Sequence, residues 1–152
     1  MRAREAMTRE VTAVSPSATV SEAAILMRST GHGALPVVGD DGRVKGLVTK
    51  TPIVRRLLPK YLEQVGDLYR SGEFRPFMDK VEEVGLLPVT DVMDPKPLTA
   101  TEDTPLAEIA AMMITHSARQ ALIVEGGRLV GIVGMQDILD IVAWPEPKAK
   151  AD

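Results

Sequence analysis

An internal repeat restricts the possible folds of this chain more than any other feature. Residues 46–52 read GLVTKTP and residues 131–137 read GIVGMQD, so a glycine, an apolar pair and a short polar tail occur twice. Met7 and Met93 are 86 residues apart, and the same offset relates further pairs: Glu22 and Glu108, Ala24 and Ala110, Met27 and Met113, and Val37 and Ile123. The offset becomes 85 after a turn that is one residue shorter in the second copy, a loss that turns tolerate. The sequence therefore predicts two copies of one structural unit.

Each copy is predicted to contain a helix that follows an extended stretch. Thr19 and Glu22 have the spacing of a capping box, in which each side chain accepts a hydrogen bond from the backbone N–H of the other residue. In the second copy Thr104 precedes Pro105, and proline is favoured at the first position of a helix. In the first copy the extended stretch is predicted at residues 11–14 and the helix is predicted to end near Ser29. In the second copy the extended stretch is predicted at residues 97–100 and the helix is predicted to end near Thr115.

Two strands and a closing helix are expected next in each copy. Short apolar runs separated by glycine-containing turns predict two β-hairpins. The closing helices are expected to begin near Thr51-Pro52 and near Gln136-Asp137. Each copy then has the order β-α-β-β-α, and because such a unit exposes apolar surface, we expect the copies to pack about a pseudo-twofold axis. The predicted strands are residues 35–38 and 44–49, and residues 121–124 and 129–134.

The chain is accordingly predicted to be an α+β protein with a helical insert between its repeats. All four tyrosine and phenylalanine residues lie in this insert, and its apolar spacing predicts two short helices separated near Ser71-Gly72. One interpretation of the insert is a small satellite core that covers one edge of the protein. The other is a mobile lid or a partner-binding surface, since aromatic residues dominate interfaces. The predicted segments are residues 1–58 (first repeat), 59–88 (insert), 89–144 (second repeat) and 145–152 (flexible tail).

Composition excludes several classes of protein. A chain of 152 residues can bury the core of one domain or of one closely packed pair. The formal net charge of −3 creates no positive field that would attract nucleic acid. Arg55, Arg56 and Lys60 are only a weak indication of nucleic-acid binding. There is no cysteine and no apolar run of membrane-spanning length, so we expect a cytoplasmic protein.

The repeated stretches resemble the paired CBS (cystathionine-β-synthase) domains that are also called a Bateman module. The resemblance is carried by SEAAILM and GALPVVGDDGRVKGLVT in the first copy, and by LAEIAAMM and QALIVEGGRLVGIVGMQDIL in the second. It implies a stand-alone regulatory module that binds an adenine nucleotide or a related adenosyl ligand in a cleft between the repeats. It also implies a homodimer that acts on an unknown client protein.

The family motif looks like Gly-apolar-apolar-Thr/Ser-x-x-Asp, and each copy keeps half of it. By resemblance, the hydroxyl contacts phosphate and the carboxylate accepts hydrogen bonds from ribose hydroxyls. The first copy has Thr49 but Pro52 in place of the aspartate, and the second has Asp137 but Gly134 in place of the hydroxyl. Structural roles are the alternative: Thr51-Pro52 would begin a helix, and a carboxylate such as Asp137 is favourable in any first helical turn.

The resemblance also assigns residues to two clefts. Arg119 is the expected phosphate partner in the first cleft, because a guanidinium can bind phosphate through two parallel hydrogen bonds. His32 lies between two glycines, which also suits an ordinary loop histidine. The residues assigned to the first cleft are Thr49, Lys50, Leu98, Ala118 and Arg119, and those assigned to the second are Thr12, His32 and Asp137.

The residues predict no catalytic constellation. His32 and His116 occupy equivalent loops and lack metal-ligand spacing, and no glycine-rich phosphate loop or Ser-His-Asp set can be assembled. We therefore expect a non-catalytic regulatory module with AMP, ADP, ATP or S-adenosylmethionine as its ligand, without metal or other cofactor. The alternative is a ligand-free dimeric interaction scaffold that uses the aromatic insert.

Overall fold

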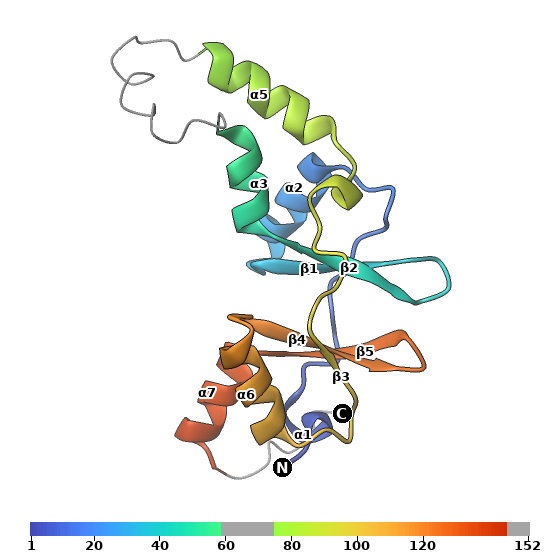
Figure 1. Cartoon of the computed structure of the whole chain (residues 1–152), viewed down its shortest axis with the longest axis vertical. Coiled ribbons are helices and arrows are strands. Elements are labelled where there is room, and N and C mark those ends of the chain that lie inside the picture. Colours follow the sequence, from blue (N-terminus) through green and yellow to red (C-terminus); the bar gives the residue numbers. More distant parts are fainter. Residues whose placement is uncertain (59–74, 146–152) are drawn as a thin grey trace. The chain divides into compact units, whose positions relative to one another are not determined.

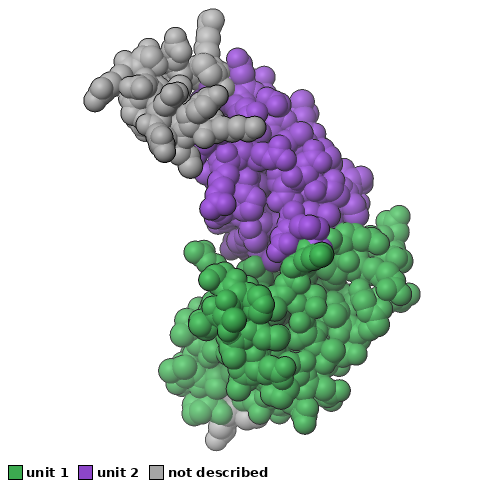
Figure 2. Space-filling view, in the orientation of Figure 1, with its two compact units in different colours: residues 1–13, 38–45, 96–152 green, residues 14–37, 46–95 purple. Residues whose placement is uncertain are grey.

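The structure is a computed structural model that describes residues 1–58 and 75–145 (Figure 1). The chain forms two compact units, which Figure 2 distinguishes by colour. Unit 1 contains residues 1–13, 38–45 and 96–152, and unit 2 contains residues 14–37 and 46–95. The first helix predicted for the insert lies outside the described residues, as does the predicted flexible tail beyond residue 145.

Unit 2 is built from most of the first repeat, the end of the insert and residues 89–95. Its two-stranded sheet pairs β1 with β2, and Val14 adds a single parallel bridge to Val37 of β1. Helices α2 and α3 cover one face of this sheet, and α5 packs against both helices. The bounds are α2 Val20–Thr30, β1 Ala34–Val38, β2 Val44–Thr49, α3 Lys50–Leu57, α5 Arg75–Leu86 and the 3₁₀ helix η2 Val89–Asp91.

Unit 1 is built from most of the second repeat, the first residues of the chain and the turn region of the first hairpin at residues 38–45. Strand β3 pairs in parallel with β4, and β4 pairs antiparallel with β5. Helices α6 and α7 cover one face of this sheet, and α1 packs against α6. The bounds are α1 Ala3–Ala6, β3 Thr99–Ala100, α6 Leu106–Thr115, β4 Gln120–Glu125, β5 Arg128–Gly134 and α7 Met135–Ala143. The predicted α+β class is confirmed, and the second repeat has the predicted order β-α-β-β-α. In the first repeat the helix, hairpin and closing helix are present as predicted, but the extended stretch at residues 11–14 forms only the single bridge of Val14.

Each unit has its own apolar core, made by equivalent positions of the two repeats. In unit 2, Ala23 and Met27 of α2 pack against Leu35, Val37 and Val48 of the sheet, and Val84 of α5 joins them. This contact supports the interpretation of the end of the insert as part of a core. The corresponding residues of unit 1 are Ile109, Met113, Ala121, Ile123 and Val133.

The predicted start of α6 was wrong by one residue, whereas α3 and α7 each begin one residue before the positions near which they were expected. Helix α3 begins at Lys50 with Thr49 as its N-cap, so Pro52 stands in the first turn, where a missing backbone N–H costs no intrahelical bond. Helix α6 begins at Leu106, because Pro105 has an extended backbone and serves as the N-cap. The hydroxyl of Thr104 instead accepts a hydrogen bond from the backbone N–H of Thr101 at 3.0 Å.

The capping box predicted for α2 is confirmed, and it makes a quantitative prediction. The backbone N–H of Glu22 donates to the hydroxyl of Thr19 at 3.1 Å, and the backbone N–H of Thr19 donates to the Glu22 carboxylate at 3.3 Å. We expect Thr19→Ala to lower the free energy of unfolding by about 1 kcal/mol, measured by urea denaturation. Thr51→Ala is the matched control, since Thr51 is exposed within α3 and caps no helix. An equal loss in both variants would contradict the assigned cap.

The repeated glycines, Gly46 and Gly131, mark the places where another segment crosses the second strand of each hairpin. In unit 1 Thr8 bridges Ile132, and in unit 2 Asp94 bridges Leu47. A Cβ atom at Gly46 would lie 2.6 Å from the carbonyl oxygen of Asp94, and one at Gly131 would lie 3.1 Å from that of Thr8. Close backbone approach therefore requires glycine at both positions.

Candidate functional site

The two closing helices begin in the same way, directly at the end of a strand. Thr49 and Gly134 are the N-caps of α3 and α7, and both have an extended backbone. Neither uses its own side chain as a cap. The first backbone N–H groups of a helix have no intrahelical partner and carry a partial positive charge, which suits an anion. Both halves of the divided motif therefore stand at helix N-termini.

Asp137 caps its own helix. Its Oδ2 accepts a hydrogen bond from the backbone N–H of Gly134 at 2.7 Å, and its Oδ1 accepts one from the hydroxyl of Thr8 at 3.3 Å. The side chain is half-buried. The structural role considered for Asp137 is thus present, and Thr8 is a partner that the sequence did not indicate. A carboxylate has about four acceptor positions, so these two bonds leave room for a ribose hydroxyl.

Arg119 lies beside the start of α7 within unit 1. Its carbonyl oxygen accepts the backbone N–H of Met135 at 3.1 Å. Its side chain is exposed, and it makes no hydrogen bond or ion pair with any described residue. The hydrogen bond places the backbone of Arg119 beside a helix N-terminus, and an exposed guanidinium is a chemically suitable phosphate contact. Sequence comparison of the repeats had not placed Arg119 next to α7.

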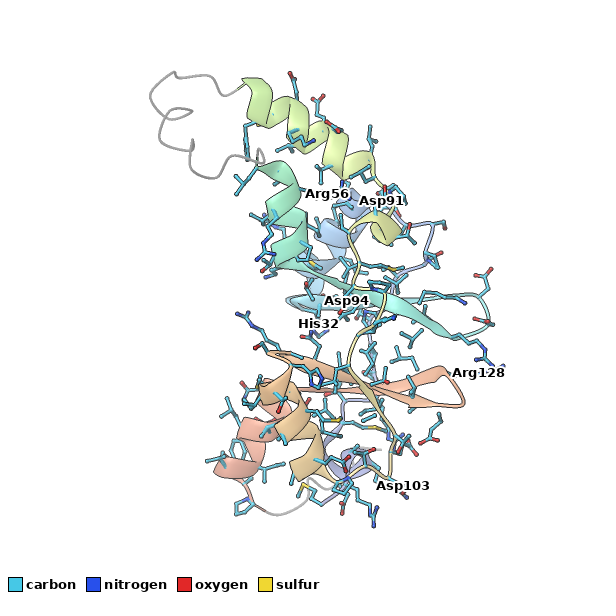
Figure 3. All side chains as sticks on the ribbon, viewed as in Figure 1. His32, Arg56, Asp91, Asp94, Asp103 and Arg128 are labelled. Atoms are coloured by element: carbon cyan, nitrogen blue, oxygen red, sulfur yellow. The ribbon has the colours of Figure 1, made fainter. Side chains whose placement is uncertain are left out.

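In unit 2, the loop after α2 lies beside the start of α3. A Cβ atom at Gly33 would lie 3.9 Å from Cε of Lys50. His32, which is labelled in Figure 3, is exposed, and its backbone N–H donates to the hydroxyl of Thr30 at 3.3 Å. The loop before the buried strand and the start of the closing helix are therefore neighbours in both units.

The remaining predicted residues are placed as follows. In unit 1, the Leu98 carbonyl accepts the backbone N–H of Leu122 and the Ala118 N–H donates to Met113, both at 2.8 Å. Thr12 is half-buried in the same unit. The first predicted cleft combines Thr49 and Lys50 of unit 2 with residues of unit 1, and the second combines His32 of unit 2 with residues of unit 1. Both combinations stay predictions.

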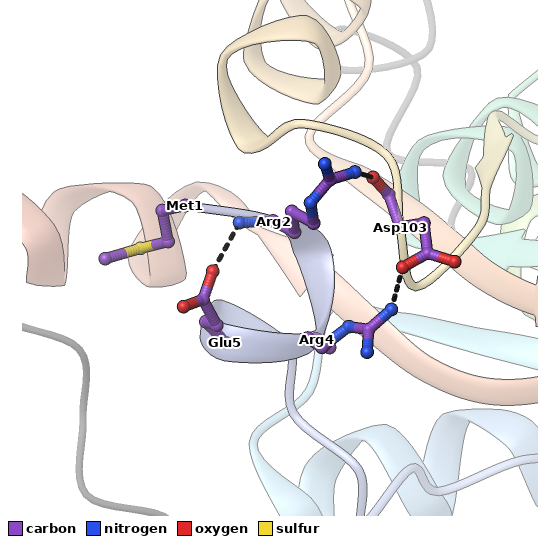
Figure 4. Close-up of a pocket in the computed structure, with 5 residues that line it drawn as sticks. All are labelled: Met1, Arg2, Arg4, Glu5 and Asp103. Carbon is purple, nitrogen blue, oxygen red and sulfur yellow. Dashed lines mark hydrogen bonds and ion pairs between the residues drawn. The ribbon is translucent and has the colours of Figure 1, made fainter.

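A shallow hollow in unit 1 was not anticipated from the sequence. Figure 4 shows its lining residues, Met1, Arg2, Arg4, Glu5 and Asp103. Arg4 forms an ion pair with Asp103, and Nη1 of Arg2 donates to the Asp103 carbonyl oxygen at 2.6 Å. Oε2 of Glu5 accepts the backbone N–H of Arg2 at 2.6 Å. These charged groups bind one another and hold α1 against the loop before α6.

The described parts of the chain contain neither a metal-binding cluster nor a membrane-spanning helix. Within residues 1–58 and 75–145, no group of three or more histidine, aspartate or glutamate side chains is arranged to hold a metal ion. No helix over the same ranges is long and apolar enough to cross a membrane.

Comparison with known proteins places these features in a family. The family model for the CBS domain matches residues 3–58 and 89–143. Protein MJ1404 of Methanocaldococcus jannaschii is 31% identical over 137 residues, which are 90% of this chain and 31% of that protein. This chain therefore spans less than a third of that relative.

Solved structures show the same fold. A conserved protein from Pyrococcus horikoshii is 32% identical, with a TM-score of 0.69 over 93% of this chain and 91% of that one. The structure of CBSX2 in complex with AMP is 22% identical, with a TM-score of 0.71 over 93% of this chain and 96% of that one.

Proposed function

Because this chain belongs to the CBS-domain family, we propose that it is a non-catalytic regulatory module whose ligand is an adenine nucleotide or another adenosyl compound. The ligand is proposed to bind between the two repeats, as the resemblance implies. The single observation that carries the proposal is the position of Arg119, whose backbone lies beside the N-terminus of α7 and whose exposed side chain has no partner among the described residues. A fold neighbour whose structure contains AMP supports it.

The proposed mechanism is thermodynamic linkage. A ligand that contacts both repeats stabilises the relative orientation in which those contacts form. A client protein that prefers the same orientation is then coupled to the ligand, typically by 1–3 kcal/mol. We further propose that the module self-associates as a homodimer and acts in the cytoplasm, where it would encounter nucleotides and a client.

A ligand-free scaffold is the second candidate function. It is favoured by the exposed apolar side chains of Phe77 and Met78 on α5, which could contact a partner. It is also favoured by the hydrogen bonds from Gly134 and Thr8, which already use both carboxylate oxygens of Asp137 as acceptors within the protein.

Thermal unfolding with added ligand distinguishes the two functions. We expect at least one of AMP, ADP, ATP and S-adenosylmethionine to raise the midpoint temperature, because a ligand at about 100 times its Kd adds roughly 2.7 kcal/mol of stability. If AMP is the ligand, we expect Arg119→Ala to weaken its binding about tenfold or more, because hydrogen bonds to charged groups are worth about 1.5–3 kcal/mol.

Adenosine and Arg128→Ala provide the controls. Binding of adenosine, which has no phosphate, should change little in Arg119→Ala. Arg128 is exposed at the start of β5, directly after the hairpin turn (Figure 3), so its loss should leave both ligands unaffected. Equal weakening of AMP and adenosine in Arg119→Ala would show that this residue does not act on phosphate.

A further inference from the structure

The two segments that cross the hairpins, residues 7–8 and 93–94, pair with their strands in the same register. The backbone N–H groups of Thr8 and Ile132 donate to each other's carbonyl oxygens, at 2.9 and 3.0 Å. Those of Asp94 and Leu47 do the same, at 2.8 and 2.9 Å. Thr8 and Asp94 are 86 residues apart, and Leu47 and Ile132 are 85 apart, as the repeat requires. Thr8 of unit 1 and Asp94 of unit 2, which we name the crossing residues, therefore occupy equivalent positions.

The crossing residue of unit 1 reaches the first turn of the closing helix. The hydroxyl of Thr8 donates to Oδ1 of Asp137, the third residue of α7, at 3.3 Å. The third residue of α3 is Pro52, whose side chain has no hydrogen-bonding group. Figure 3 shows Asp94 beside β2, the strand that leads to α3. Because the register is shared, the carboxylate of Asp94 is expected to lie near Pro52, as the hydroxyl of Thr8 lies near Asp137.

The start of each closing helix thus has one hydroxyl and one carboxylate, but their sources differ. In unit 1 the hydroxyl comes from the crossing residue, Thr8, and the carboxylate from the helix, as Asp137. In unit 2 the hydroxyl comes from the N-cap, Thr49, and the carboxylate from the crossing residue, Asp94. The Thr49 side chain does not cap α3, and Asp94 is exposed, so a ligand can reach both groups. The carboxylate that is missing from the first motif is therefore supplied by a residue outside the motif.

We propose, resting on the nucleotide ligand proposed above, that Asp94 accepts hydrogen bonds from the ribose hydroxyls of an adenine nucleotide at the first repeat. A carboxylate has about four acceptor positions, so Asp94 can keep its interactions within the protein and still accept two hydroxyl groups. The hydroxyl of Thr49 and the cationic side chain of Lys50, the next residue, are suitable contacts for the phosphate.

Isothermal titration with AMP, ADP and ATP, each compared with its 2′-deoxy form, tests this role. The 2′-deoxy forms lack one of the two hydroxyl groups that Asp94 would accept. The titrations use the Asp137→Asn chain, which removes the helix carboxylate of the second repeat. We expect this chain to bind at least one nucleotide about tenfold more tightly than its 2′-deoxy form, and added Asp94→Asn to reduce this preference to about twofold or less. A purely structural role of Asp94 would lower the midpoint of thermal unfolding without changing the preference.

Two further variants provide the control and the rescue. Asp91→Asn is the matched control, since Asp91 is an exposed aspartate on η2, three residues before Asp94 (Figure 3), and the preference should persist in this variant. Pro52→Asp, added to the chain that carries Asp94→Asn and Asp137→Asn, should restore the preference, because it places a carboxylate where the motif has one.

The outcomes separate this role from nucleotide binding itself. A preference that survives Asp94→Asn, or that is absent from the Asp137→Asn chain, would overturn the role of Asp94 while nucleotide binding by the wild-type chain stands. A preference that is lost equally in Asp91→Asn, or that Pro52→Asp does not restore, would also overturn it. A wild-type chain that binds none of the three nucleotides would overturn the nucleotide ligand together with the role of Asp94.

Discussion

Ile109→Ala is expected to lower the free energy of unfolding by about 2–5 kcal/mol, the largest loss from any single truncation considered for this chain. Ile109 is fully buried on α6, where it packs with Met113 and Ile123 in the core of unit 1. Removing its side chain loses the transfer free energy of three carbon atoms and leaves a cavity that rigid neighbours fill only partly. Urea denaturation followed by circular dichroism measures the change.

Leu86→Ala is the control for this truncation. Leu86 is the last residue of α5 and is 79% exposed, so its loss removes a comparable aliphatic side chain without creating a cavity. We expect its unfolding free energy to stay within about 0.5 kcal/mol of the wild-type value. If Ile109→Ala lowered the free energy of unfolding as little as Leu86→Ala, the result would contradict the burial of Ile109 between α6 and its sheet.

Gly46→Ala is expected to cost about 1–3 kcal/mol, because a new methyl group must displace backbone. Its Cβ would lie 2.6 Å from both the carbonyl oxygen of Asp94 and Sδ of Met93. At Gly131 the tightest contact, 2.8 Å, is with Sδ of Met7, a flexible side chain, and the backbone oxygen of Thr8 is 3.1 Å away. Gly46→Ala should therefore be the more destabilising of the two variants.

Gly33→Ala separates this steric effect from the general effect of replacing glycine. At Gly33 the nearest atom to a new Cβ is Cε of Lys50 at 3.9 Å, an ordinary contact. Its unfolding free energy should be unchanged or slightly raised, since alanine restricts the unfolded chain. Equal destabilisation of Gly33→Ala and Gly46→Ala in urea denaturation would contradict the close crossing at residues 93–94.

The sequence predicted those features of the fold that depend on neighbouring residues. The capping box of Thr19 and Glu22 and the apolar runs of the hairpins are local signals, and the structure contains both. Repetition then located the second copy of each element. The start of α6 was misplaced by one residue because proline suits both the N-cap and the first turn, and only the backbone conformation distinguishes them.

Local sequence signals did not predict which segments distant in the chain pair with one another. Residues 1–13 belong to unit 1, where Thr8 pairs with Ile132 and bonds to Asp137, yet nothing local to these residues indicates a partner so distant in the chain. For the candidate site, the motif halves at Thr49 and Asp137 were correctly expected near helix starts. The proximity of Arg119 to α7 depends on the β4–β5 pairing and could not be read from spacing.

Isothermal titration of AMP, ADP, ATP and S-adenosylmethionine into the full chain, at two temperatures, tests the proposed ligand most directly. Two temperatures are needed because a binding enthalpy that is zero at one is not zero at the other. Saturable heat with at least one of the four, retained in Arg128→Ala, is the result predicted for a regulatory module. The absence of saturable heat from all four at both temperatures would contradict adenosyl-ligand binding and favour the ligand-free scaffold.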